Sequence, residues 1–243
     1  MSEPLPRALI DHASAYFRPA GPFAWRFARG KLRADPAFRA ILAHGLLAPA
    51  QHLLDLGAGQ GLLAACLLAS AAWHADPQRH PWPRSWPPPP HLKTYTGIEI
   101  NPSEVRRARR AFALDAGAAV RMVHGDIRVA DYGTPDAIVL LDVLHYNGYA
   151  TQEAILARVR AALPADGVLV LRVGDADGGV GCALSQAFDR TVALARRGRW
   201  ARLHVRPLAR WQELLRRVGF RVRTVPLASA RVLRNALLVA HCA

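Results

Sequence analysis

Two apolar segments constrain the fold of this chain more than any other feature of its sequence. Residues 136–142 enclose the run Ala-Ile-Val-Leu-Leu, and residues 167–173 read Gly-Val-Leu-Val-Leu-Arg-Val. Strands that are apolar on both faces are typical of the centre of a parallel sheet, because helices cover such a sheet on both sides. The two segments therefore predict an α/β fold in which strands alternate with crossover helices.

Further strand-like segments precede and follow these two runs. We expect strands over residues 52–56, 95–100, 120–124, 220–226 and 236–242, and helices over residues 22–29, 36–44, 62–72, 102–118, 151–163, 183–196 and 208–218. Gly30 and Gly219 are expected to end two of these helices, and Asp35 to cap the helix that starts at Pro36. No helix separates the last two strands, so they should form an antiparallel hairpin at one edge of a doubly wound sheet.

The sequence divides into an N-terminal helical part, residues 1–49, and a part with the alternating pattern, residues 50–243. Residues 73–91 interrupt the pattern with a tetraproline run at 87–90 and with Trp73, Trp82 and Trp86. Consecutive prolines cannot donate backbone hydrogen bonds and favour polyproline II. We interpret this segment as an inserted loop that its tryptophans fold back over the body, in preference to a partner-binding proline tract.

Composition limits the class of protein. Hydrophobic residues make up 51% of the chain and charged residues 21%, which excludes wholesale disorder. No apolar run approaches the ~18 residues of a membrane span, and the first residues show no basic segment followed by an apolar one. Cys66, Cys182 and Cys242 form no C-x-x-C motif, so we expect free buried thiols and no metal site. We predict a cytoplasmic protein.

The formal net charge of +14 would attract acidic partners such as nucleic acid, an anionic membrane or an acidic carrier protein. Lys31 and Lys93 are the only lysines, so arginine supplies nearly all of the positive charge, and the arginines are spread along the chain. Abundant alanine, arginine and proline are what a GC-rich genome produces through codon bias. This explanation is favoured over a dedicated nucleic-acid surface.

The most specific motif lies at residues 53–61, Leu-Leu-Asp-Leu-Gly-Ala-Gly-Gln-Gly, between a predicted strand and a predicted helix. Glycines at such a turn let the backbone bend tightly and let a ligand approach the chain without a Cβ in the way. A nicotinamide fingerprint requires G-x-G-x-x-G/A, but the last position here is Leu62. This mismatch, together with Asp55 upstream, argues against NAD.

Three acidic residues follow at the ends of successive predicted strands. Glu99 can accept both ribose hydroxyls of an adenosine, and removing the 19-residue insert 73–91 restores the usual spacing of about 20 residues from the glycines. Asp126 ends the third strand, where an adenine ring would lie, and Asp142 ends the fourth, beside the topological switch point. No P-loop lysine is present, as expected for an adenosine site without phosphates.

In this order, the glycines and acids resemble class I S-adenosylmethionine-dependent methyltransferases over residues 50–243. The resemblance implies a seven-stranded sheet of order 3-2-1-4-5-7-6 with the last strand antiparallel, an N-terminal helical lid, and S-adenosylmethionine as cofactor. It implies that the glycines line the methionine part of the cofactor, Glu99 the ribose, and Asp126 with Ile127 the adenine edge. The full predicted cofactor set is Asp55, Gly57, Ala58, Gly59, Gly61, Glu99, Ile100, Asp126, Ile127 and Asp142.

The residues at the end of the fourth strand indicate the class of acceptor. Enzymes that methylate exocyclic amines typically carry (D/N)-P-P-(Y/F) there, whereas residues 142–145, Asp-Val-Leu-His, look like those of small-molecule methyltransferases. His145 is the candidate general base, with packing against the cofactor as the alternative. Tyr146 is the second candidate catalytic residue. Tyr146 and Tyr149 would orient an aromatic acceptor; the alternative is that both are ordinary core or rim residues.

Two further residues are candidates for the acceptor pocket. Arg172 would bind an acceptor carboxylate or form a surface ion pair. Tyr16 would add aromatic surface from the lid.

A narrower resemblance concerns residues 27–33, 142–146 and 172–175, which look like the methyltransferases encoded with aryl polyene (xanthomonadin-type) pigment pathways. It implies a phenolic aryl acceptor, methylated on oxygen or on an adjacent ring carbon. It also implies an acidic acyl carrier protein as partner, which the basic surface would attract. The competing interpretations are RNA methylation, which the charge favours and the fourth-strand motif opposes, and a non-catalytic scaffold of the same fold.

Overall fold

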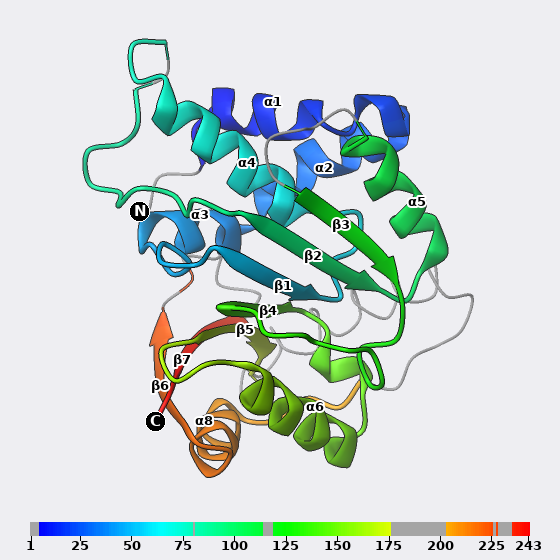
Figure 1. Cartoon of the computed structure of the whole chain (residues 1–243), viewed down its shortest axis with the longest axis vertical. Helices are drawn as coiled ribbons and strands as arrows, with labels where there is room; N and C mark the ends of the chain where they lie inside the picture. Colours follow the sequence, from blue (N-terminus) through cyan, green and yellow to red (C-terminus); the bar gives the residue numbers. More distant parts are fainter. Residues whose placement is uncertain (1–4, 80, 114–118, 176–202, 226, 228–234) are drawn as a thin grey trace. The chain divides into compact units, whose positions relative to one another are not determined.

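The computed structural model describes residues 5–79, 81–113, 119–175, 203–225, 227 and 235–243 (Figure 1). The predicted helix at 183–196 and Cys182 lie outside these residues. The chain forms two compact units, Met1–Gly125 and Asp126–Ala243. Its strands form a seven-stranded sheet in the order β3-β2-β1-β4-β5-β7-β6, which confirms the predicted sheet order.

The described residues of the first unit form three parallel strands and six helical elements. The strands are β1 (His52–Leu56), β2 (Thr94–Glu99) and β3 (Ala119–His124), with β2 paired to both neighbours. The helical elements are α1 (Arg7–Ala15), the 3-10 turn η1 (Arg18–Ala20), α2 (Pro22–Ala34), α3 (Pro36–Ala43), α4 (Leu62–Ala75) and α5 (Pro102–Ala111). The Asp35 carboxylate caps α3 as predicted, because it accepts a hydrogen bond from the backbone N–H of Ala37 at 3.0 Å.

Two predicted helix ends in this unit are wrong. Gly30 does not end a helix, because α2 continues through it to Ala34. A glycine in a helix interior costs about 1 kcal/mol relative to alanine, and the buried residues Ala28 and Leu32 on either side outweigh that cost. The helix predicted over residues 102–118 is shorter than expected, since α5 ends at Ala111.

The predicted start of the insert at residue 73 is wrong, because α4 continues through Trp73 to Ala75. Residues 82–87 of the insert pack on the segment from α3 to Gly45. Trp82 and Trp86 pack edge to face with ring centroids 5.6 Å apart, and the Arg39 guanidinium of α3 lies over Trp86. Pro87 packs so closely on Gly45 that a Cβ there would lie 2.6 Å from the proline Cγ. These contacts hold the second half of the insert against the segment that follows α3.

In the second unit, the part of the chain that the structure describes forms four strands, two α-helices and a 3-10 turn. Its elements are β4 (Ala137–Leu141), the 3-10 turn η2 (Leu144–Tyr146), α6 (Tyr149–Ala162), β5 (Val168–Gly174), α8 (Leu208–Arg217), β6 (Phe220–Val225) and β7 (Asn235–Cys242). β4 runs parallel to β5, whereas β7 lies antiparallel to both β5 and β6. The predicted hairpin of β6 and β7 is therefore confirmed, and Gly219, at φ +97°, ends α8 as expected.

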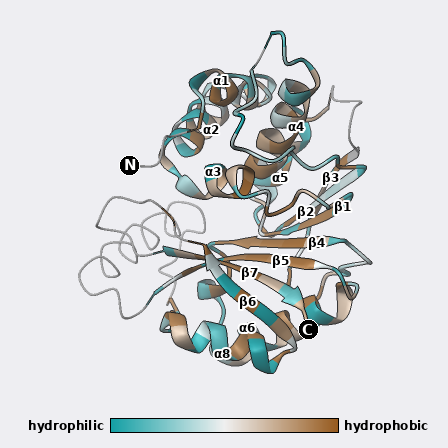
Figure 2. Cartoon of the chain, turned by 90° about the vertical axis from the view of Figure 1, so that its left-hand side faces the viewer, coloured by the Kyte–Doolittle hydropathy of each residue, from teal (hydrophilic) through white to brown (hydrophobic). Residues whose placement is uncertain are grey.

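The two apolar runs form the centre of this unit. Residues 137–140 of β4 and 169–171 of β5 have no exposed surface, and Figure 2 shows both strands as hydrophobic along their length. The edge strand β6 instead exposes Arg221 and Arg223. This contrast is the physical basis of the sequence prediction, since strands covered on both faces carry no polar alternation.

The structure also tests the predictions for the thiols and for the membrane. Cys66 and Cys242 are buried free thiols, as predicted. Burial raises the pKa of the Cys66 thiol to about 12, so this group is an inert structural side chain. Within the described residues, no helix has the length and apolar character required to cross a membrane.

Candidate functional site

The glycine loop after β1 is fixed to the end of β2 by backbone hydrogen bonds. The N–H groups of Gly57 and Ala58 both donate to the carbonyl oxygen of Ile98, at 2.8 and 3.1 Å. The next N–H group, that of Gly59, donates to Oε2 of Glu99 at 3.0 Å. The predicted glycine motif and the predicted ribose-binding acid are therefore joined directly in one site.

The glycines of this site are needed for different reasons. A Cβ on Gly61 would lie 2.7 Å from the Phe112 ring, and one on Gly97 of β2 would lie 2.8 Å from the Ala58 Cβ. A Cβ on Gly59 would meet nothing within 4 Å, although its φ of +58° disfavours other residues. Close packing therefore requires Gly61 and Gly97, whereas Gly59 leaves open space in front of the loop. The role of Gly97 was not predicted, although a glycine inside a strand signals close backbone approach.

The Glu99 carboxylate is held at both oxygens by backbone donors. In addition to the Gly59 contact, its Oε1 accepts a hydrogen bond from the N–H of Asn101 at 2.7 Å. Asn101 in turn caps α5 through Ser103. Ile100, the next predicted residue, has an exposed side chain, and its carbonyl oxygen lies 3.1 Å from Nε2 of His124. Glu99 is thus oriented before any ligand binds, and each carboxylate oxygen retains capacity to accept another hydrogen bond.

Asp55 forms a buried pair with Tyr95 that the sequence did not reveal. Both side chains are almost fully buried, and the Tyr95 hydroxyl donates a short hydrogen bond to Oδ2 of Asp55. Burial raises the pKa of Asp55 to about 7; the Tyr95 hydrogen bond opposes this shift, and the negative charge of Glu99 adds to it. Burial also raises the pKa of Tyr95, so its hydroxyl remains the donor.

This raised pKa predicts a pH dependence of stability. Because Asp55 binds its proton more tightly in the folded chain than in the unfolded chain, its contribution to the free energy of unfolding is complete below pH 3.8 and is lost as the pH rises to about 7. Asp55→Asn keeps the acceptor for Tyr95 but removes the titration. We expect denaturant unfolding between pH 5 and 8 to show a smaller fall in stability for Asp55→Asn than for the unmodified chain. Equal slopes would contradict the assignment.

The N-terminal helices contact the glycine loop through two side chains. Gln60, which is 2% exposed, donates from Nε2 to the carbonyl oxygen of Ala24 in α2 at 3.0 Å. Phe112, which lies against Gly61, packs edge to face with the buried Phe17. Tyr16, the predicted lid residue, packs on the same Phe112 ring with centroids 5.7 Å apart. These helices are therefore packed on the loop itself.

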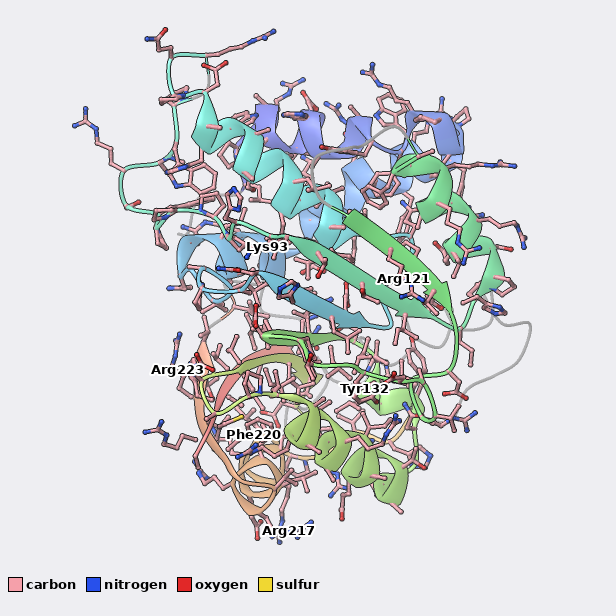
Figure 3. The ribbon with its side chains drawn as sticks, viewed as in Figure 1. Lys93, Arg121, Tyr132, Arg217, Phe220 and Arg223 are labelled. Atoms are coloured by element: carbon pink, nitrogen blue, oxygen red, sulfur yellow. The ribbon has the colours of Figure 1, made fainter. Side chains whose placement is uncertain are left out.

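In the second unit, Asp126 and Ile127 lie in a loop with many internal contacts. The Asp126 carboxylate accepts from the backbone N–H of Arg128 at 2.9 Å and pairs with its guanidinium. Ile127 is buried, and its carbonyl oxygen accepts from the Tyr132 hydroxyl at 2.6 Å. Tyr132 is labelled in Figure 3. This loop is thus rigidly organised.

Asp142 and Arg172 form a partly buried ion pair at the ends of β4 and β5. The Arg172 side chain is 5% exposed, and its Nε and Nη2 donate to the two oxygens of the Asp142 carboxylate, the Nε contact at 2.6 Å. Asp142 has a φ of +58°, the only positive φ of a non-glycine residue in the described part of the chain. Arg172 therefore forms an ion pair, but not on the surface as predicted, because the strands bury its side chain.

The turn after Asp142 carries both candidate catalytic residues. His145 is 7% exposed, and its ring lies against that of Tyr146 with centroids 4.2 Å apart. Tyr149 follows at the start of α6; it is 49% exposed and donates from its hydroxyl to the Val205 carbonyl oxygen at 3.3 Å. Where side chains are described, no group of three or more His, Cys, Asp or Glu residues is arranged to hold a metal ion.

The predicted site residues thus fall into two sets, one in each unit. The first unit brings together Asp55, Gly57, Ala58, Gly59, Gly61, Glu99 and Ile100, and it also holds Tyr16 against Phe112. The second unit holds Asp126, Ile127, Asp142, His145, Tyr146, Tyr149 and Arg172. In the first unit the glycine loop follows β1 and Glu99 ends β2, and in the second unit Asp142 and the turn with His145 and Tyr146 follow β4. These residues lie at the carboxyl ends of strands, where open α/β sheets bind their ligands.

The sheet order, with a glycine loop after its first strand, defines the fold of a methyltransferase domain. Residues 54–169 match the family model described as a methyltransferase domain. Among curated proteins, the carboxy-S-adenosyl-L-methionine synthase of Chromohalobacter salexigens is 37% identical over 84 residues, which are 34% of this chain and 31% of that protein.

Solved structures share the fold. An O-methyltransferase family protein from Burkholderia thailandensis matches with a TM-score of 0.63 and 20% identity, covering 93% of this chain and 62% of the other. Human N-acetylserotonin methyltransferase in complex with SAM matches with a TM-score of 0.61 and 17% identity, covering 97% of this chain and 58% of the other. This chain thus spans about a third of the curated relative and about three fifths of each of these structures. Together the matches show that the chain has the fold of a methyltransferase domain.

Proposed function

We propose that this protein transfers a methyl group from S-adenosylmethionine to a hydroxyl group of a small aromatic acceptor. The observation that carries the proposal is the preorganised pair of glycine loop and Glu99, joined by the Gly59–Glu99 hydrogen bond at 3.0 Å. A carboxylate fixed by backbone donors loses little conformational freedom when it accepts hydroxyl groups. The site therefore suits the sugar of an adenosine-type cofactor.

The residues of the first unit fit S-adenosylmethionine. The open space beyond Gly59 is one that a Cβ would begin to fill, as expected where a ligand approaches the backbone. The Glu99 carboxylate gives this site a negative character that suits a sulfonium cation. In this proposal the glycine loop holds the methionine part, Glu99 and Ile100 hold the ribose, and Asp126 with Ile127 contacts the adenine edge.

When bound, S-adenosylmethionine supplies an electrophilic methyl group that an oxygen nucleophile displaces from sulfur. The chain must hold the acceptor in line and remove the proton from its hydroxyl group. We assign the proton removal to His145, whose imidazole titrates near neutral pH in its ordinary state. Tyr146 restrains the imidazole by ring contact at 4.2 Å and presents aromatic surface to the acceptor.

The acceptor class is supported by the relatives and by the narrower sequence resemblance. One matching structure is a mitomycin 7-O-methyltransferase, with 21% identity and a TM-score of 0.60. The resemblance to aryl polyene pathway enzymes extends the proposal to a phenolic aryl precursor, either free or bound to an acidic acyl carrier protein. Tyr16, Tyr149 and Arg172 remain proposed acceptor-site residues, although Arg172 is paired with Asp142 in the structure.

The positive charge is distributed over both units, which bears on the partner. Arg121 on β3, Arg217 on α8 and Arg223 on β6 are exposed, and all three are labelled in Figure 3. Arginine spread over separate elements increases the rate of encounter with an acidic protein without forming a base-reading surface. Binding of an acyl carrier protein and of RNA, each titrated against salt, tests this proposal; tighter RNA binding with a steep salt slope would favour RNA methylation.

His145→Ala tests the chemical assignment. We expect turnover to fall by about 100-fold or more, because general-base catalysis contributes typically 10²–10⁴-fold, while the Kd for S-adenosylmethionine changes less than threefold. The measurement uses labelled S-adenosylmethionine with a panel of hydroxybenzoates, both free and carrier-bound. His241→Ala, on the exposed side of β7, is the matched control and should keep full turnover. Unchanged turnover in His145→Ala would remove this residue from the chemistry.

A further inference from the structure

Helix α6 connects to both functional segments of the second unit through two polar side chains. We propose that Gln152 is a positioning residue for the turn that carries His145 and Tyr146, and that Arg158 is a positioning residue for the loop that carries Asp126 and Ile127. This inference rests on the proposed function. Gln152 orients the residues proposed to act on the acceptor, and Arg158 orients the residues proposed to contact the adenine.

Gln152 has no exposed surface, and its amide nitrogen contacts three carbonyl oxygens. Nε2 lies 3.2 Å from the oxygen of Leu144, 2.9 Å from that of Asn147 and 2.8 Å from that of His204. The first two oxygens belong to the 3-10 turn η2 and to its C-cap. The third belongs to a segment whose own N–H, that of His204, donates to the carbonyl oxygen of His145 at 2.8 Å.

Arg206 completes the same cluster from the other side of the amide. Its Nε donates to Oε1 of Gln152 at 2.9 Å, and its Nη2 donates to the Tyr149 carbonyl oxygen at 3.1 Å and to Glu153 at 2.9 Å. The guanidinium also lies over the Tyr149 ring. Both ends of the Gln152 amide are thus engaged, which fixes its orientation and, through it, the backbone on either side of His145.

Arg158 performs an equivalent task six residues further along α6. Its Nη1 donates to the carbonyl oxygens of Ile127 and Arg128, at 3.0 and 2.7 Å, and its Nη2 donates to that of Ala130. The guanidinium also lies over the Tyr132 ring, with Cζ 4.2 Å from the centroid. Tyr132 donates to the same Ile127 oxygen. One cation therefore holds three carbonyl groups of the loop in which Asp126 and Ile127 lie.

These contacts go beyond what a surface helix needs for packing. The packing of α6 comes from Ile155, Leu156 and Val159, which are fully or almost fully buried. Gln152 and Arg158 are six residues apart, or about 1.7 turns, so they point in different directions from the helix. Charge-assisted and buried hydrogen bonds to backbone carbonyls restrict local geometry, and misplacement by about 1 Å costs catalysis heavily.

The test uses three variants of α6 in the full chain. Gln152→Leu removes the amide, and Arg158→Met removes the guanidinium. Arg160→Met is the matched control, because Arg160 donates to the Gly219 carbonyl oxygen at 3.1 Å, outside both segments. For Gln152→Leu we expect kcat to fall at least 10-fold with the Kd for S-adenosylmethionine within threefold of the unmodified value. For Arg158→Met we expect that Kd to rise at least 10-fold, with Arg158→Lys restoring part of it.

Two readouts need no identified acceptor. Calorimetry with S-adenosylmethionine measures Kd, and the imidazole resonances of His145 should shift in Gln152→Leu but not in Arg158→Met or Arg160→Met. If all three variants change Kd and the His145 resonances alike, α6 has only a structural role and the inference is overturned. If the unmodified chain does not bind S-adenosylmethionine, the proposed function itself fails. If it binds and Arg158→Met binds equally well, only the inference fails.

Discussion

Gly59→Arg should abolish detectable binding of S-adenosylmethionine, with an increase in Kd of at least 100-fold. Gly59 sits at the turn of the glycine loop, and a Cβ there would meet no atom within 4 Å, so an arginine side chain would extend into the proposed path of the cofactor. Its guanidinium would also place a positive charge where a sulfonium cation is expected. Calorimetry with S-adenosylmethionine measures the effect, and a 100-fold change corresponds to about 2.7 kcal/mol.

Gly133→Arg is the control for backbone strain. Gly133 has a φ of +60°, against +58° for Gly59, and a Cβ there would also meet nothing within 4 Å. Both variants therefore carry the same cost of a left-handed non-glycine residue, roughly 1–2 kcal/mol. Gly133 is outside the predicted cofactor set, so its variant should bind S-adenosylmethionine nearly as well as the unmodified chain. Equal loss of binding in the two variants would assign the effect to strain.

Arg172→Met should lower the free energy of unfolding by about 2–3 kcal/mol. Removing one partner of a buried ion pair costs about 3–5 kcal/mol, because it leaves the other charge without compensation. The Asp142 side chain is 28% exposed, so water offsets part of that cost. The methionine preserves most of the apolar contacts of the arginine stem. Denaturant unfolding measures the change.

Two further variants separate the ion pair from general packing. Arg121→Met changes an exposed arginine on β3 and should alter stability by less than about 0.5 kcal/mol. Arg172→Met combined with Asp142→Gly should recover at least half of the loss, since glycine removes the unpaired carboxylate and accepts a φ of +58° without strain. An Arg172→Met variant as stable as Arg121→Met would show that the ion pair contributes nothing to stability.

The positive φ of Asp142 bears on the function of this pair. Residues held in unusual backbone conformations require strong local contacts, and such contacts cluster at functional sites. Here the contacts come from Arg172, two hydrogen bonds from one guanidinium. Asp142 directly precedes the turn with His145 and Tyr146. We therefore expect the combined variant to recover stability without recovering full turnover.

The local patterns of the sequence predicted most elements of the fold. Apolar runs identified β4 and β5, because helices cover a central parallel strand on both faces, and β1 has its predicted bounds. The wrong end predicted for α2 has a tertiary cause. α2 passes through Gly30 because residues on either side of it are buried, and burial outweighs propensity.

The sequence by itself determined the alternation of strands and helices, the glycine loop and the acid at the end of β2, because each depends on residues close together in the chain. Only the tertiary structure decided the partners of the remaining polar groups. Tyr95 meets Asp55 across 40 residues, Arg172 meets Asp142 across 30, and Gln152 meets His204 across 52. Such pairs leave no periodic pattern, since the sheet and α6 bring them together only after folding, and their burial then gives each hydrogen bond its effect on the site.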